Sequence, residues 1–403
     1  MFEEDKIKTT TEKTRIESID VFRGLTILTM VFVNDVASVK NISEWMKHFP
    51  SNIDGMTFVD IVFPAFLFIV GMAIPFAFQK RAEKGESTVS VLGHLLFRTA
   101  GLIFLGVMMV NVSSINEEVA GISMYMWMLL LYVSVILVWN SYSDVKNKFI
   151  SFGFRAIGVV GLLYLMIVYR SGDGSQWLQT KWWGILGLIG WAYLSSASAY
   201  ILLKKNITAL TALLSIFIFI YMAERSGQYV WMNYVGNIVW LGMAISSHAA
   251  LTTAGIILSL IIIKYKDESN TKLFFVMSLF GLFLMMGGYL LRPYYGISKN
   301  FATPSWVFYC AGICVTVFIF LYWLIDVKKI KKIFSFIKPA GSNPLLAYML
   351  PSIIYAIIGL TNFSIYGTMF GDGWVGIVRS LVFSLFILGL TALFTKMKIR
   401  LHL

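Results

Sequence analysis

Charged residues are scarce in this 403-residue chain, at 13% of the sequence, whereas hydrophobic residues make up 58%. An average soluble domain is about 25% charged and about 45–50% apolar. A water-soluble globular protein is therefore excluded, and the composition predicts a membrane protein that uses about 20 residues for each span. The aromatic content of 16% suits side chains at membrane interfaces and on lipid-facing surfaces.

Cysteine and histidine are also rare, with two and four residues respectively. Cys310 and Cys314 lie four residues apart in the apolar run FYCAGICVTVF, which places both on one face of a helix. That arrangement excludes a disulfide framework and a four-ligand zinc site, so we interpret both as small packing residues. No histidines, cysteines and carboxylates elsewhere have the spacing of metal ligands, and no bound metal is expected.

The formal net charge is +12, yet the basic residues occur in short clusters between apolar runs. This distribution is typical of membrane topology and argues against a nucleic-acid partner. If the N-terminus is assigned to the cytoplasm, about 24 of the 33 basic residues fall on the cytoplasmic side and about eight on the other. Both termini are therefore predicted to be cytoplasmic. Residues 1–19 lack the hydrophobic stretch of a signal peptide, so none is predicted.

Long apolar segments recur along the chain, and they are too long for the alternating strands of a membrane β-barrel. They predict an all-α polytopic membrane protein with about twelve transmembrane helices, within a range of about 10–12. We expect a cytoplasmic segment at 1–19, a single transmembrane domain at 20–396 and a cytoplasmic tail at 397–403. The predicted helices cover 20–37, 58–78, 91–111, 120–139, 151–169, 182–203, 207–223, 245–263, 273–291, 304–325, 343–360 and 374–395.

Ionisable side chains at the cytoplasmic ends of these helices form a first group of candidate binding residues. Asp20 and Arg23 lie three residues apart at the start of the first helix, Arg98 enters the third helix from the same side, and Arg15 precedes the first helix. A charged group inside a membrane segment costs about 2.5–3.5 kcal/mol on insertion scales, which makes each a functional candidate. Two interpretations stay open. Asp20 and Arg23 form an ion pair with Arg23 extending to lipid phosphates, or the arginines form a phosphate site.

A second group of polar residues lies at the opposite, external ends. Asn34 and Asp35 end the first helix, His48 lies in the following loop, and Asp60 lies one turn into the second helix. A neutral imidazole can take a proton from a nucleophile, and an amide N–H can stabilise a developing oxyanion. His248, at the external entrance of the eighth helix, is expected to face the same cavity. A lone loop histidine is more often structural than catalytic, so the clustering of these side chains carries the functional interpretation.

Two long blocks of the chain resemble the heparan-α-glucosaminide N-acetyltransferase family of transmembrane acyltransferases, including its bacterial relatives. They are RIESIDVFRGLTILTMVFVN at 15–34 and KHFPSNIDGMTFVDIVFPAFLFIVGMAI at 47–74. The resemblance is strongest over 15–111. It resumes more weakly at TAGIILSLIIIKY (253–265), ISKNFATPSWVFYC (297–310) and GSNPLLAYML (341–350). The chain departs from the family in an extra helix pair around 182–223 and in the loop between Asn34 and His48.

The resemblance implies an enzyme that takes an acetyl group from cytoplasmic acetyl-CoA and transfers it to an amino sugar on the far side of the membrane. By matching to the family's motifs, His48 is the expected active-site histidine, with Asn34 and Asp60 as its catalytic partners. Arg23, Arg98, Arg15 and Asp20 are the expected acetyl-CoA residues. The expected residues for the sugar acceptor are Asp35, Lys299, Asn300 and His248.

An amino-sugar transporter is the alternative interpretation, because some bacterial relatives are associated with amino-sugar uptake. It explains the many spans and the aromatic-rich external loops, but it does not explain the pairing of His48 with Asn34, and no inverted repeat is apparent. The enzyme is therefore favoured. The expected location is the inner membrane of a bacterium, and a homodimer is compatible with the sequence.

Overall fold

A computed structural model describes residues 16–363 and 365–402. Each of the twelve predicted segments contains a helix. The long helices are α2 (Glu17–Val36), α3 (Val59–Glu83), α4 (Thr88–Asn111), α6 (Met124–Trp139), α7 (Lys148–Val168), α8 (Ile185–Leu203), α9 (Ile207–Arg225), α11 (His248–Tyr265), α12 (Asn270–Tyr295), α13 (Pro304–Tyr322), α15 (Pro344–Leu360) and α17 (Gly373–Lys396). Within the described residues the remaining regular structure is short helices and isolated β-bridges, so the all-α prediction is confirmed.

Short helical elements connect or extend the long ones. The π-helical turn η3 runs directly into α11 and lengthens that helix beyond the predicted start at residue 245. The short elements are η1 (Glu44–Met46), η2 (Val112–Ser114), α5 (Glu117–Ala120), α10 (Val230–Ile238), η3 (Leu241–Ser247), η4 (Trp323–Val327), η5 (Lys332–Ile337), α14 (Lys338–Ser342) and α16 (Ile365–Thr368).

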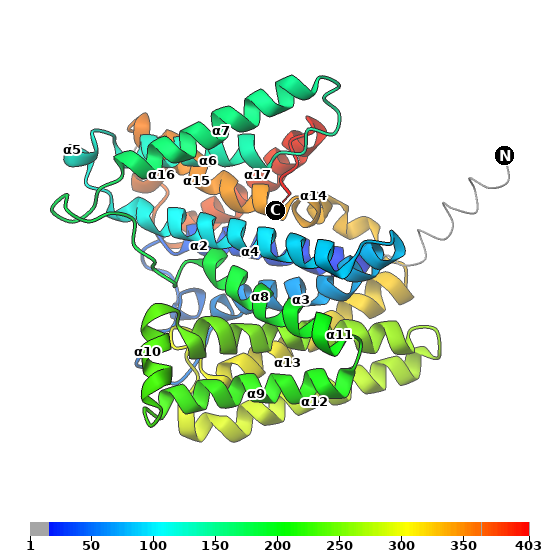
Figure 1. Cartoon of the computed structure of the whole chain (residues 1–403). Helices are drawn as coiled ribbons and strands as arrows, with labels where there is room; N and C mark the ends of the chain where they lie inside the picture. Colours follow the sequence, from blue (N-terminus) through cyan, green and yellow to red (C-terminus); the bar gives the residue numbers. More distant parts are fainter. Residues whose placement is uncertain (1–15, 364, 403) are drawn as a thin grey trace, which may run out of the picture.

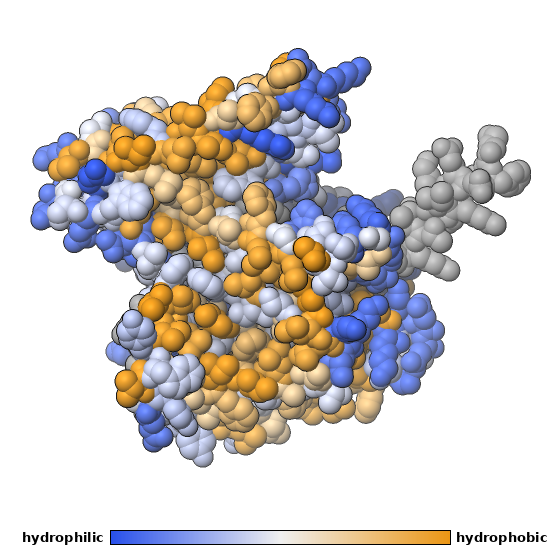
Figure 2. Space-filling model, in the orientation of Figure 1, coloured by the Kyte–Doolittle hydropathy of each residue, from blue (hydrophilic) through white to orange (hydrophobic). Residues whose placement is uncertain are grey.

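Among the described residues, nine helices are long and apolar enough to cross a membrane, or ten if one bent pair counts as a single span. This number lies at the lower end of the predicted range. Two predicted spans, α2 and α6, are not among these helices, because one is too charged and the other is too short. Helix α2 carries four charged residues, and α6 has only 16 residues. Figure 2 shows hydrophobic side chains in a broad band between two hydrophilic ends, as expected of a multi-pass membrane protein.

The helices form three groups that lie side by side (Figure 1). Helices α2, α3, α4 and α8 lie in the middle, α9, α11, α12 and α13 pack on one side, and α6, α7, α15 and α17 on the other. The span Leu241–Tyr265, which includes α11, is 94% buried, whereas α7 is only 17% buried and lies at the periphery. The membrane-spanning core is therefore centred on α3 and α11.

Close contact between α3 and α11 depends on two glycines. A Cβ atom at Gly71 would lie 1.8 Å from the carbonyl oxygen of Thr252, and one at Gly255 would lie 2.0 Å from that of Phe68. The Ser259 hydroxyl also donates a hydrogen bond of 2.8 Å to the Met72 carbonyl. Small residues of this kind let membrane helices approach backbone to backbone. The pairing holds the start of α3, and the loop that precedes it, against the start of α11.

The bent span consists of Lys332–Ser342 and Pro344–Leu360, which meet at an angle of 78°. Asn343 lies at the bend, and its amide nitrogen donates to the Ile399 carbonyl at 2.8 Å while its amide oxygen accepts from the Leu401 N–H at 3.2 Å. These bonds hold the C-terminal residues against the beginning of α15. Residues 399–401 therefore lie beside the helix bend.

Candidate active site

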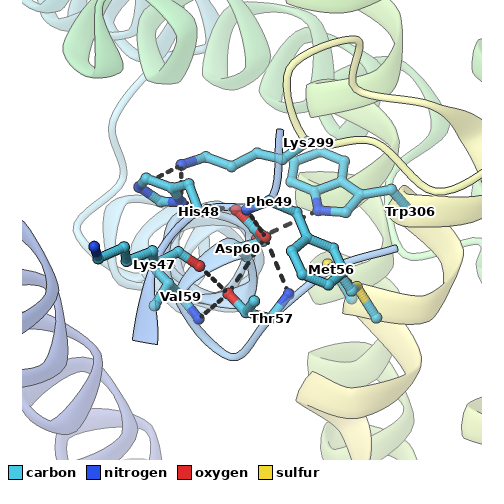
Figure 3. A network of polar contacts seen from close by, with 10 residues as sticks. Lys47, His48, Phe49, Met56, Thr57, Val59, Asp60, Lys299 and Trp306 are labelled. Carbon is cyan, nitrogen blue, oxygen red and sulfur yellow. Dashed lines mark hydrogen bonds and ion pairs between the residues drawn. The ribbon is translucent and has the colours of Figure 1, made fainter. Parts of the chain in front are cut away.

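The loop before α3 presents His48 at the end of the protein where α2 ends and α3 begins, which we call the His48 end. The Thr57 hydroxyl donates to the Lys47 carbonyl at 2.8 Å, which fixes the backbone next to His48. Asp60, in the first turn of α3, accepts from the backbone N–H groups of Thr57 at 3.0 Å and Phe49 at 3.3 Å. Figure 3 shows these bonds converging on the Asp60 carboxylate. The loop is thus folded around the carboxylate.

The remaining oxygen of that carboxylate holds His48. Asp60 Oδ1 lies 2.7 Å from His48 Nδ1, and the Asp60 side chain is 2% exposed while that of His48 is 40% exposed. A carboxylate can only accept, so Nδ1 is the donor and the lone pair of the neutral ring lies on Nε2. Trp306 also donates its indole N–H to the Asp60 carbonyl at 3.3 Å. The arrangement orients His48 as a proton acceptor.

Lys299 approaches the same imidazole from the connection between α12 and α13. Its Nζ lies 3.1 Å from both ring nitrogens of His48, as Figure 3 shows. Burial lowers the pKa of the Lys299 ammonium, while the nearby Asp60 carboxylate acts in the opposite direction. Three titratable groups are therefore contiguous, namely Asp60, His48 and Lys299, although Lys299 lies 251 positions from His48 in the sequence.

His48 and Lys299 line a large cavity, about 1110 Å³ in volume. We call it the central cavity. Asn300 and His248 line it too, so four predicted site residues share one space. Its other walls are mainly aromatic and apolar; they include Phe63, Met109, Met124, Met128, Tyr132, Trp183, Trp240, Met243, Phe301, Tyr348 and Ser352. Few polar groups converging in a largely apolar cavity are typical of small-molecule sites.

His248 lies at the start of α11 and is buried. Its ring packs on Phe63 and Trp306, with ring centres 5.4 and 6.2 Å away. Trp306 in turn bonds the backbone of Asp60. His248 therefore belongs to the wall behind the His48–Asp60 pair and faces the cavity, as the sequence predicted.

Asn34 occupies a neighbouring space rather than the central cavity. It is exposed and lines a cavity of about 140 Å³ with Tyr355, Tyr348 and Ser352, and the last two residues also line the central cavity. Among the described contacts none joins Asn34 to His48. The cavities of Asn34 and His48 are therefore neighbours that share Tyr348 and Ser352 of α15.

Two further cavities lead from the central cavity toward the opposite end of the protein, which we call the Arg23 end. One, of about 210 Å³, contains Arg98 and shares Leu186 and Tyr348 with the central cavity. The other, of about 240 Å³, contains Arg98 and Arg23. Adjacent cavities therefore form a row between the two predicted groups of site residues.

The predicted phosphate residues differ in their surroundings. Arg23 Nη1 pairs with Asp20 at 3.3 Å and donates to the Gly341 carbonyl at 3.2 Å, so the predicted ion pair is present. Arg98 lies over the Tyr193 ring, 4.7 Å from its centre, and its buried Nε forms no hydrogen bond within the described residues. Arg15 lies outside the described residues. Arg98 and Arg23 line a common cavity, which Asp20 does not line.

Asp35, a predicted sugar contact, does not line any of the cavities described above. Its carboxylate accepts from the hydroxyls of Tyr355 at 2.6 Å and Tyr366 at 2.7 Å, and it pairs with Arg379 at 3.0 Å. These three partners satisfy the buried carboxylate and join α2 to α17. The sugar contact of Asp35 stays a prediction, and the structure gives this residue a role in helix packing.

Several cavity residues escaped the sequence analysis. Tyr348 and Ser352 lie four residues apart on α15 and face two cavities at once. The block GSNPLLAYML contains Tyr348, but it was noted only for its family resemblance. Trp183, Trp240 and Tyr132 resembled ordinary membrane aromatics, and nothing in their local pattern distinguishes a cavity wall from a lipid contact. Among the described residues no three or more His, Cys, Asp or Glu side chains lie close enough to hold a metal ion.

The model of a family described as "Domain of unknown function (DUF5009)" matches residues 15–241, more than half of the chain. The chain belongs to the DUF5009 family. Asn34, His48, Asp60 and Arg98 fall inside the DUF5009 match, whereas Lys299 lies beyond it.

Two curated proteins are also similar to this DUF5009 member. Heparan-alpha-glucosaminide N-acetyltransferase of Mus musculus is 38% identical over 98 residues, and that of Homo sapiens is 37% identical over 98 residues. The matched stretch covers 24% of this chain and 14% of each relative, so only a small part of their length is represented. The predicted resemblance to this acetyltransferase family is confirmed.

Proposed function

We propose that this protein is a transmembrane acyltransferase that moves an acetyl group from acetyl-CoA to an amino sugar. The observation that carries the proposal is the orientation of His48. Asp60 engages Nδ1 at 2.7 Å, and Nε2 is left to act as a base beside a cavity of about 1110 Å³. Similarity to two proteins named as N-acetyltransferases supports the same chemistry.

Acetyl-CoA enters from the Arg23 end in this proposal. Its phosphates bind Arg98 and Arg23, since guanidinium groups suit bidentate phosphate recognition. The unpartnered Nε of Arg98 supports this, because a buried polar group without a partner is costly unless a ligand supplies one. The long acyl-bearing arm occupies the row of small cavities, and the thioester reaches the central cavity. In the orientation predicted from the basic residues, the Arg23 end is cytoplasmic.

The reaction requires one proton acceptor. An amino-sugar ammonium gives a proton to His48 Nε2, and the resulting amine attacks the thioester carbonyl. The C–N bond forms as the C–S bond breaks, and the departing sulfur takes the second amine proton. Asn34, from the neighbouring cavity, is the proposed hydrogen-bond donor to the carbonyl oxygen, which gains negative charge during the attack. Lys299, Asn300 and His248 are the proposed contacts of the sugar.

The aromatic walls of the central cavity suit the acceptor side of this reaction. Trp183, Trp240 and Tyr132 offer flat apolar faces beside a small number of polar groups, as expected of a site for a compact ligand. The location proposed is the inner membrane of a bacterium, with the acceptor bound on the external side. A row of cavities also fits the alternative of amino-sugar transport, but transport does not require the His48–Asp60 pair.

The decisive experiment incubates the purified full chain with labelled acetyl-CoA and glucosamine or galactosamine. N-acetylglucosamine, whose amine is already blocked, is the control acceptor. Labelled product with the free amines alone is expected. Sugar uptake into proteoliposomes without any acetylated product would establish transport instead and reject the enzyme.

A pair of histidine variants tests the role of His48. His48→Ala should lower the rate by about 10²–10⁴-fold, the usual cost of losing a general base. Acetyl-CoA binding should persist, because the phosphate residues lie at the other end. His94→Ala is the matched control, since His94 is 57% exposed and its closest ionic neighbour is Glu86 at 4.0 Å. Equal rates for the two variants would remove His48 from the mechanism.

A further inference from the structure

The side chain of Lys299 is placed beside the proposed base with more precision than a general sugar contact needs. The connection that carries it turns sharply at Gly296 and Ala302, whose φ angles are +60° and +46°. Asp54 accepts from the Ile297 N–H at 2.7 Å, and the Thr303 hydroxyl accepts from the Ser298 N–H at 3.0 Å.

Two more bonds complete the anchoring of this loop. The Ser305 hydroxyl donates to the Gly296 carbonyl, and the Tyr221 hydroxyl donates to the Phe301 carbonyl at 3.0 Å. The backbone on both sides of Lys299 is therefore fixed by side chains of α9, α13 and the loop before α3. A lysine on so restrained a loop keeps its amine at a defined place.

The groups around Nζ define what that amine can do. His48 lies at 3.1 Å, Asp60 and Cys310 act on it electrostatically, and His248 lines the same cavity. On the outer side of the loop, Arg292 is already paired with Asp54. Burial lowers the pKa of Lys299, so a larger fraction of its amine is neutral near pH 7 than in a free lysine. A neutral amine accepts a proton, whereas an ammonium cannot.

His48 needs such an acceptor if it works as proposed. Asp60 occupies Nδ1, so the proton taken at Nε2 must leave from the cavity side before the next turnover. Lys299 is at hydrogen-bonding distance on that side and is also partly exposed to solvent. This geometry links His48 to water through a single group.

We propose that Lys299 relays to external water the proton that His48 removes from the acceptor amine. His48 Nε2–H gives its proton to the neutral Nζ, which becomes an ammonium and then releases one proton to water. No other bond forms or breaks in this step, and the overall reaction still releases one proton for each amide made. The inference rests on the proposed acyltransferase function and makes Lys299 a positioning residue that acts through His48.

Two substitutions separate a relay from a positive charge that binds substrate. Lys299→Met removes the exchangeable proton, and Lys299→Arg keeps a permanent charge that cannot accept a proton. The relay predicts that both variants lose at least about tenfold in kcat. It also predicts that small buffers such as imidazole restore the rate in proportion to their concentration, while the wild type does not respond. Lys40→Met and Lys40→Arg, at an exposed lysine of the same end, are the matched controls.

The pH profile gives a second readout. In the wild type, raising the pH increases the neutral fraction of Lys299 and therefore the rate; this rise should be absent in Lys299→Met. A Lys299→Arg variant with wild-type kcat overturns the relay, and so does a loss that no buffer restores. Melting temperatures identify variants that fail to fold, and Lys299→Gln replaces Lys299→Met in that case. If the wild type acetylates amines, His48→Ala does not, and Lys299→Met is unaffected, the relay and the sugar contact of Lys299 both fail, while the acyltransferase function stands.

Discussion

Arg379 on α17 and Asp35 on α2 form a buried ion pair, with Nη2 3.0 Å from Oδ2 and side-chain exposures of 8% and 2%. Tyr355 and Tyr366 complete the shell around the carboxylate. The pair joins the end of the first helix to the last helix of the chain. Asp35 directly follows Asn34 on α2.

Removing the Asp35 charge should destabilise the protein strongly. Asp35→Asn leaves the Arg379 guanidinium buried without its counter-ion, a change that costs about 3–5 kcal/mol in other proteins. The expected result is a clear fall in melting temperature in detergent. Asp144→Asn, which breaks the exposed pair with Lys398, is the matched control and should have little effect. Equal melting temperatures would contradict the structural role assigned to Asp35.

Asp60→Asn should reduce turnover more than it reduces acetyl-CoA affinity. An amide can donate to Nδ1, which would move the ring proton to Nε2 and remove the base, and a comparable exchange in serine proteases costs about 10⁴-fold. We expect a loss of at least about 10²-fold in kcat, measured by steady-state kinetics with saturating acetyl-CoA. Glu44→Gln, an exposed acid in the preceding loop, should retain full activity. A fully active Asp60→Asn enzyme would show that the pair only supports the loop.

Arg98→Leu should weaken acetyl-CoA binding by about 10- to 100-fold, because a hydrogen bond to a charged group is worth about 1.5–3 kcal/mol. Calorimetric titration of the purified protein measures the change in Kd. Arg155→Leu is the control; Arg155 also lies over a tyrosine ring, that of Tyr142, at 5.4 Å, but on the peripheral helix α7. If both variants bind acetyl-CoA with wild-type affinity, the phosphates bind elsewhere.

The predicted orientation can be measured with single cysteines. Cys310 and Cys314 are buried, so they can be replaced by alanine to give a background without native thiols. In intact cells an impermeant maleimide should label Asp173→Cys, at the His48 end, and should leave Lys332→Cys unlabelled until the membrane is permeabilised. This expectation rests on the excess of basic residues in the loops predicted to be cytoplasmic. The reverse labelling pattern would show the opposite orientation, with the proposed acetyl-CoA site on the external side.

Much of the fold is a consequence of local composition and could be predicted from the sequence. Apolar runs of membrane length form helices because backbone groups have no other partners in lipid, and each predicted run holds one. The sequence also predicted that His48 and Asp60 lie close together, since both occur within a short stretch at the same end of two consecutive helices. The start of α11 was harder to predict, because the π-helical turn before it carries Ser and Gly residues that favour no single structure.

Tertiary packing decided what no local pattern encodes. Lys299 reaches His48 across 251 positions of the chain, and Arg379 reaches Asp35 across 344. Composition determines that each helix lies in the membrane. The rotation of a helix about its own axis, however, is set by the neighbours against which it packs. This rotation determines whether a polar side chain faces a cavity or another helix. Asn34 and Asp35 are adjacent in sequence, yet one faces a cavity and the other is sealed against α17 because successive residues on a helix point in different directions.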